Sequence, residues 1–137
     1  IYGPGSSTLD RLRSGKAKQI DRPGHVFSRI HVDDIVQTVW ASMRSPNPGS
    51  IYNVADDEPC EPSTLILAGA KLLGISAPPP QLYNAAELSS MAASFWKECR
   101  RVNNTKIKQE LGVQLIHPTY REGLRSIWEL EQRTKLR

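Results

Sequence analysis

The sequence predicts an α/β fold with two or three short strands and about five helices. The main observation is a change in the hydrophobic period. Residues 25–31 alternate in a way that suits a strand, whereas apolar residues recur at helical spacing from Val32 onward. The second observation is that proline, glycine and capping residues divide the remaining chain into short helical segments.

The N-terminal residues are typical of a strand end. The apolar dipeptide at residues 1–2 runs straight into a Gly-Pro-Gly turn at residues 3–5. Because Ile1 is not an initiator residue and the start of such a strand is absent, we expect a fragment of a longer protein. A short helix is expected over residues 7–14, ending near Gly15.

A strand, a helix and a second strand are expected in succession over residues 25–55. Asp33 and Asp34 fall in the first turn of this helix, where carboxylates complement the positive end of the helix dipole. The helix should end before Pro46. Residues 51–55 are β-prone and lead into an acidic loop.

Four further helices are expected at residues 62–73, 84–100, 104–112 and 120–133. The first should end at Gly74, which can adopt a left-handed cap. Asn84 with Glu87, and Thr119 with Glu122, have the spacing of capping boxes.

Composition places the chain among ordinary folded proteins. It has 137 residues, of which 39% are hydrophobic and 23% are charged, enough for one compact domain with its own core. No apolar run approaches the roughly 18 residues that would suggest a membrane span, so we expect a cytoplasmic protein. Cys60 and Cys99 lack metal-ligand spacing and should be reduced and structural.

The basic charge lies in the C-terminal part. From Ser94 onward, ten Lys or Arg residues face five acidic ones. These charges alternate with apolar residues and follow neither a DNA-reading motif nor a pattern of stacking aromatics. We therefore interpret them as a solvated helical face, and a basic helical module that binds nucleic acid remains the alternative.

Several motifs in order resemble the second half of extended short-chain dehydrogenases/reductases of the NAD-dependent epimerase/dehydratase type. They are IYGPG at 1–5, FSRIHVDDIVQTVWASM at 27–43, IYNVADDEP at 51–59, and NTKIKQELG followed by YREGL. The resemblance runs nearly end to end. It implies the C-terminal part of a Rossmann-type protein with a helical substrate lobe, in which an absent N-terminal half supplies the NAD or NADP site.

The resemblance also implies two sites. In this family the segment that matches Tyr2, Gly3 and Pro4 borders the nicotinamide, and a plain structural turn is the alternative. Many members that use nucleotide-linked sugars carry an Arg-Asp-Phe sequence whose Arg contacts the substrate diphosphate, but here Phe27 stands at that Arg position. An aromatic ring cannot make the hydrogen bonds of a guanidinium, so Arg29 is the candidate for an acidic substrate, with a structural salt bridge as the alternative.

Catalytic residues are not expected within this chain. Cofactor binding in this fold class needs a Gly-rich strand-to-helix turn, and no G-x-G-x-x-G occurs. The family also uses a Tyr-x-x-x-Lys pair for proton transfer. None of Tyr2, Tyr52, Tyr83 and Tyr120 is followed by Lys four residues later.

A metal site is not expected either. His31, Asp33 and Asp34 cluster in sequence, but helix-starting carboxylates are common caps and no third ligand is evident. We interpret these residues as scaffold.

These observations predict the substrate-binding portion of an NAD(P)-dependent oxidoreductase, epimerase or dehydratase, which is not catalytically complete alone. A non-catalytic NAD(P)-binding sensor or scaffold of the atypical branch is the alternative. Expected partners are the missing Rossmann half or a second copy of the chain, and a small-molecule substrate. A membrane partner is not expected.

Overall fold

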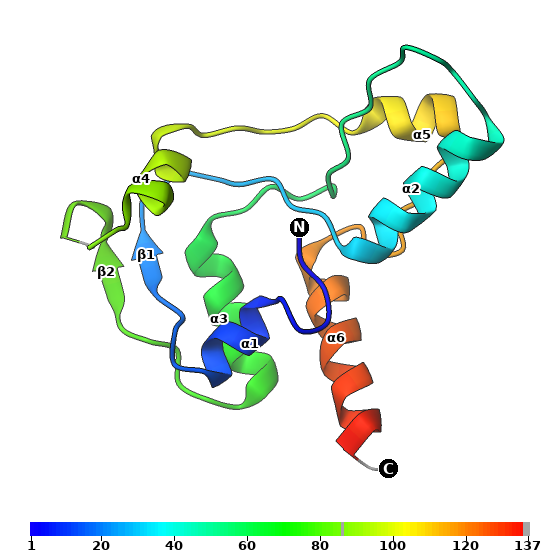
Figure 1. Cartoon of the computed structure of the whole chain (residues 1–137). Coiled ribbons are helices and arrows are strands. Elements are labelled where there is room, and N and C mark those ends of the chain that lie inside the picture. Colours follow the sequence, from blue (N-terminus) through cyan, green and yellow to red (C-terminus); the bar gives the residue numbers. More distant parts are fainter. Residues whose placement is uncertain (86, 136–137) are drawn as a thin grey trace.

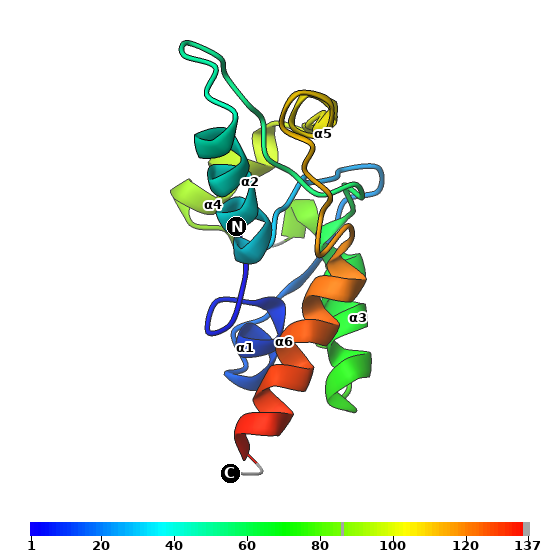
Figure 2. The same ribbon diagram turned by 90° about the vertical axis from the view of Figure 1, so that its right-hand side faces the viewer.

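Six α-helices and a two-stranded parallel sheet make up the part of the chain that the computed structural model describes, residues 1–85 and 87–135. The elements are α1 (Thr8–Arg13), β1 (Gln19–Asp21), α2 (Val32–Arg44), α3 (Pro62–Leu73), β2 (Pro80–Leu82), the 3₁₀ turn η1 (Tyr83–Ala85), α4 (Ser90–Lys97), α5 (Thr105–Leu111) and α6 (Tyr120–Lys135). In Figure 1, α1, α3 and α6 lie together, with α2 and α5 on one side and the strands with α4 on the other. Figure 2 shows the same three helices stacked below α2, α4 and α5.

The main hydrophobic core lies between α1, α3 and α6. Leu9, Leu65, Leu124 and Ile127 are buried there, together with the ring of Tyr2. Burying a large aliphatic side chain contributes roughly 1.5–3 kcal/mol to the free energy of folding. This cluster therefore stabilises helices that would be too short to be stable in isolation.

Gly69 allows α1 and α3 to approach closely. A Cβ atom at this position would lie 2.8 Å from Leu12 Cδ1 and 3.2 Å from Thr8 Cγ2. The two helices can lie this close together because residue 69 has no side chain.

The helix ends largely follow the sequence signals. Ser7 and Asp10 form a capping box at α1, and Gly74 ends α3 in the left-handed conformation with φ 67°. At α6 the backbone N–H of Thr119 donates to Glu122 Oε2 at 3.0 Å. The expected helices at 7–14, 62–73 and 120–133 are confirmed.

The strand predictions were wrong in position. Residues 25–31 make only isolated bridges, at Phe27 and His31, and residues 51–55 form no strand. The two strands are instead β1 and β2, which pair in parallel with Ile20 opposite Gln81. Three-residue strands are too short to show an alternating pattern, which explains why the sequence did not reveal them.

The helix expected over residues 84–100 is also wrong in extent. The structure has η1, and then α4, which begins after Ser89, whose hydroxyl accepts the N–H of Ala92 at 3.2 Å. Asn104 precedes α5 as predicted, but its side chain does not cap the helix. Its amide instead donates to Ala55 O at 2.8 Å and to Asp57 Oδ1 at 2.7 Å.

The α/β class with a few short strands and several helices is confirmed. None of the helices in the described residues has the length and apolar character that crossing a bilayer requires.

Candidate functional site

The N-terminal turn is fixed against the start of α2. The N–H of Tyr2 donates to Ile30 O at 3.0 Å, and the N–H of Val32 donates to Tyr2 O at 2.9 Å. A Cβ atom at Gly3 would lie only 2.7 Å from Val32 Cγ1. The close packing explains the glycine and holds the turn at one end of the helix.

The predicted cofactor-binding residues differ in exposure. Tyr2 and Gly3 are buried, whereas Pro4 is exposed. The Tyr2 ring packs edge-on against His31, with ring centroids 5.1 Å apart. Burial, followed by the nearby Asp56, raises the pKa of the Tyr2 hydroxyl, so this phenol remains protonated near neutral pH.

Arg29, which we expect to bind the substrate, is half-buried, and its guanidinium donates hydrogen bonds to backbone carbonyl groups of this chain. Its Nη1 donates to Phe27 O at 2.8 Å and to Cys60 O at 3.0 Å, and lies 3.2 Å from Cys60 Sγ. These contacts join the extended segment before α2 to the loop before α3.

Both cysteines are free, and Cys60 is buried. Burial raises the pKa of the Cys60 thiol to about 11. A thiol with such a pKa is a poor nucleophile, which agrees with the structural interpretation.

Asp56 is a buried carboxyl group that sequence reasoning did not single out. Its Oδ1 accepts the N–H of Glu58 at 3.3 Å, and its backbone N–H donates to Arg29 O at 2.6 Å. Burial raises the pKa of Asp56 to about 6, although the Glu58 N–H and the charge of Arg29 favour the ionised form.

Asp34 joins α2 to the loop before α6. Its fully buried carboxylate accepts the N–H of Ile116 at 2.6 Å and the N–H of His117 at 3.0 Å. The Gln37 side chain also donates to it, at 2.5 Å. The interpretation of Asp34 as scaffold agrees with these hydrogen bonds.

The hydrogen bonds of Asp34 also place the His117 imidazole beside His31 and Asp33. His117 Nε2 lies 3.0 Å from Asp33 Oδ2, and His31 Nδ1 lies 3.4 Å from the same oxygen. The two imidazoles are buried, with ring centroids 4.0 Å apart. Burial, and then the neighbouring His117, lowers the pKa of His31, so its ring is neutral near pH 7. No local pattern could have identified His117, because residues 84 positions apart in sequence have no fixed spatial relationship.

His31 also caps α2. Its Nδ1 accepts the N–H of Asp33 at 3.1 Å, while its Nε2 is buried without a hydrogen-bond partner among the described residues.

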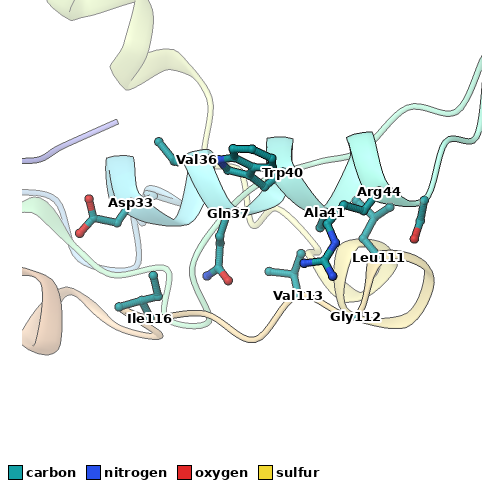
Figure 3. Close-up of a pocket in the computed structure, with 11 residues that line it drawn as sticks. Asp33, Val36, Gln37, Trp40, Ala41, Arg44, Leu111, Gly112, Val113 and Ile116 are labelled. Carbon is teal, nitrogen blue, oxygen red and sulfur yellow. The ribbon is translucent and has the colours of Figure 1, made fainter.

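A groove of about 680 Å³ lies between α2 and α5. Figure 3 shows Asp33 and Ile116 at one end of it, and Arg44 with Leu111 at the other. Apolar residues of α2 share the exposed side of this helix, namely Val32, Val36, Val39, Trp40 and Met43. The helical spacing of this stripe was predicted, but the face is solvent-exposed in this chain, with Trp40 61% exposed.

No family model matches the chain. The 3-diazoavenalumate denitrifying reductase of a Streptomyces species is 31% identical over 134 residues, which cover 90% of this chain and 43% of the reductase.

Solved structures match over nearly the whole chain. A functionally unknown conserved protein from Silicibacter pomeroyi aligns with a TM-score of 0.90 and 46% identity, covering 96% of this chain and 46% of that protein. The dTDP-glucose 4,6-dehydratase of Bacillus anthracis, in complex with NAD, aligns with a TM-score of 0.71 and 16% identity, covering 98% of this chain and 42% of that one.

The chain thus spans less than half the length of each of these proteins. In fold, the chain is similar to the C-terminal part of extended short-chain dehydrogenases/reductases of the NAD-dependent epimerase/dehydratase type.

Proposed function

We propose that this chain is the substrate-side part of a longer NAD(P)-dependent oxidoreductase and is not catalytically complete alone. This proposal rests on one observation. Nearly the whole chain matches a reductase and an NAD-bound dehydratase, but in each case the match covers less than half of the other protein. The sequence contains neither a Gly-rich dinucleotide turn nor a Tyr-x-x-x-Lys pair. In this proposal both belong to a Rossmann part of the longer polypeptide.

The turn at residues 2–4 is our proposed contact with the cofactor. Because Tyr2 and Gly3 are buried, contact would involve the exposed ring of Pro4 and backbone atoms of the turn. The buried Tyr2 hydroxyl would not serve as the catalytic acid, because its raised pKa opposes proton release.

Arg29 is our proposed determinant of substrate binding. Its Nη1 already binds Phe27 O and Cys60 O, so an acidic substrate group would bind the other nitrogens of the guanidinium. Loss of Arg29 would also loosen the segment that carries Phe27.

The surroundings of Phe27 favour a substrate without a diphosphate. Phe27 packs edge-on against Trp96 and His25, with ring centroids 5.4 Å and 5.0 Å apart. Aromatic groups here suit an apolar or planar part of the substrate better than a diphosphate. The name of the reductase relative, which specifies 3-diazoavenalumate, provides the first compound to test.

We prefer an active enzyme to a non-catalytic NAD(P)-binding sensor. The 31% identical relative is a reductase, and this supports turnover. A Gly-rich loop with a Tyr-x-x-x-Lys pair upstream of Ile1 would favour the enzyme, whereas a Gly-rich loop alone would favour the sensor.

The longer polypeptide, expressed from the gene that encodes this chain, tests the proposal. We expect it to bind NADH or NADPH and to oxidise it with 3-diazoavenalumate or a related small molecule. Arg29→Lys should raise KM for the substrate and leave cofactor affinity unchanged, while Arg125→Lys, on the exposed side of α6, should change neither. Failure of the longer protein to bind either cofactor would overturn the proposal.

A further inference from the structure

His31, Asp33 and His117 form a compact group of metal-ligating side chains. One ligand atom from each residue lies within 4.8 Å of the other two. The Asp33 carboxylate is central, because its Oδ2 lies 3.0 Å from His117 Nε2 and 3.4 Å from His31 Nδ1.

We propose that these three residues bind a divalent transition-metal ion, with Zn²⁺ as the ion that fits them best. Imidazole nitrogen and carboxylate oxygen are the ligand types of zinc sites that have three protein ligands. Ligands about 2.0–2.1 Å from a tetrahedral ion lie roughly 3.3 Å from one another. The two distances to Asp33 Oδ2 therefore need little adjustment for an ion to bind.

The surrounding structure holds the three ligands in place. The carboxylate of Asp34 accepts the backbone N–H of His117 at 3.0 Å, and the backbone of Tyr2 pairs with that of His31. These contacts fix the backbone of His31 and His117 close to Asp33, so the three side chains are already near one another before an ion binds. Binding through His31 Nδ1 would replace the single hydrogen bond from the N–H of Asp33.

An unsatisfied group lies in the same cluster. His31 is 1% exposed, and its Nε2 has no hydrogen-bond partner among the described residues. Because Nδ1 accepts the N–H of Asp33, the neutral ring carries its proton on Nε2, and Nδ1 is the nitrogen whose lone pair can bind the ion. The proposed ion site does not depend on the proposed function.

The ion can reach the cluster from solvent. The Asp33 side chain is 52% exposed and lines the groove between α2 and α5 (Figure 3). Three protein ligands with an open side leave a coordination position for water or another small ligand, as in catalytic rather than closed structural zinc sites.

Calorimetric titration of the 137-residue chain with ZnCl₂, and visible spectroscopy with CoCl₂, test the proposal. We expect one Zn²⁺ per chain, and Co²⁺ bands typical of four- or five-coordinate nitrogen and oxygen ligation. His117→Gln and Asp33→Asn should each weaken Zn²⁺ binding at least about 10-fold. His25→Gln is the matched control, because the chain has 3 histidines and His25 lies in the aromatic cluster with Trp96.

The alternative is that hydrogen bonds alone hold the three side chains together. In that case Zn²⁺ does not bind, or it binds equally well to His117→Gln and Asp33→Asn, and either result overturns the proposal. If circular dichroism shows that His117→Gln is unfolded, Asp33→Asn decides the matter, because Asp33 is half-exposed. Weakening in His25→Gln equal to that in Asp33→Asn would also overturn the site.

Discussion

A Cβ atom at Gly123 would lie 2.7 Å from Tyr2 Cζ and closer still to the Tyr2 hydroxyl oxygen. The first turn of α6 therefore presses directly against the N-terminal segment. The proposed cofactor-side turn and the C-terminal helix form one packed unit as a result, although they lie at opposite ends of the sequence (Figure 1).

We predict that Gly123→Ala destabilises the chain. Within a helix this change ordinarily stabilises by about 0.5–1 kcal/mol, but overpacking against Tyr2 should outweigh that gain and cost about 1–3 kcal/mol net. Urea unfolding measures the difference, with Arg125→Ala as an exposed control in the same helix. A stabilised Gly123→Ala variant would show that the Tyr2 ring does not occupy this position.

The adjacent residues Asp33 and Asp34 should differ sharply in their contribution to stability. Asp34→Ala leaves the N–H groups of Ile116 and His117 without their acceptor, which should cost about 3 kcal/mol or more. In metal-free buffer, Asp33→Ala removes a half-exposed carboxylate and should cost about 1 kcal/mol or less. Equal losses of free energy of unfolding would contradict the central position of Asp34 between α2 and the loop before α6.

The stability of the chain should depend on pH through Asp56. Its pKa is raised from 3.8 to about 6 in the folded state, so the folded state holds this proton more tightly than the unfolded state does. The resulting stabilisation is complete below pH 4 and is lost as pH rises through 6.

Asp56→Asn tests this dependence, because the amide cannot ionise. At pH 7 to 8 the variant should be more stable than the wild type by on the order of 2 kcal/mol. Between pH 6 and 4 this advantage should shrink, as the wild type gains its proton. An advantage that does not change with pH would show that Asp56 titrates normally.

The sequence predicted best those features that depend on interactions between residues close together in the chain. Helix starts at Ser7 and Thr119 follow from side chains that bond to nearby backbone groups. The helix end at Gly74 follows from the left-handed conformation that glycine adopts readily. Asn104 shows the limit of such reasoning, because its amide binds Ala55 O and Asp57 rather than the helix that it precedes.

Long-range pairing was predicted poorly. The match of β1 with β2 joins segments about 60 residues apart through backbone groups that every residue carries. The meeting of His117 with Asp33 depends on the hydrogen bonds of Asp34, which no local pattern shows. The family resemblance anticipated the fold, whereas it did not anticipate this cluster.

The exposed apolar stripe on α2 should drive self-association of the isolated chain. Val36 and Val39 are each 52% exposed, and exposed apolar faces of this kind promote association. Sedimentation at tens of micromolar should show dimers or larger species, and Val36→Lys with Val39→Lys should shift the chain toward monomer. A wild-type chain that sediments as a stable monomer without dye-accessible apolar surface would contradict this prediction.

Trp40 should matter more in the longer protein than in this chain. Since its side chain is 61% exposed here, Trp40→Ala should change the free energy of unfolding of this chain by less than about 1 kcal/mol. If a Rossmann part of the longer protein covers this face of α2, the same change should cost about 3–5 kcal/mol there. Equal small effects in both proteins would argue against coverage of this face.

Calorimetric titration of NADPH and NADH into this chain and into the longer protein distinguishes a substrate-side part from a complete cofactor-binding domain. We propose that these 137 residues form the substrate side of an NAD(P)-dependent enzyme, and their sequence lacks the pyrophosphate-binding turn. We predict micromolar binding, worth about −8 kcal/mol, to the longer protein, and at most millimolar binding to this chain alone. Micromolar binding of either cofactor to the isolated 137-residue chain would show that it contains a complete dinucleotide site, contrary to our proposal.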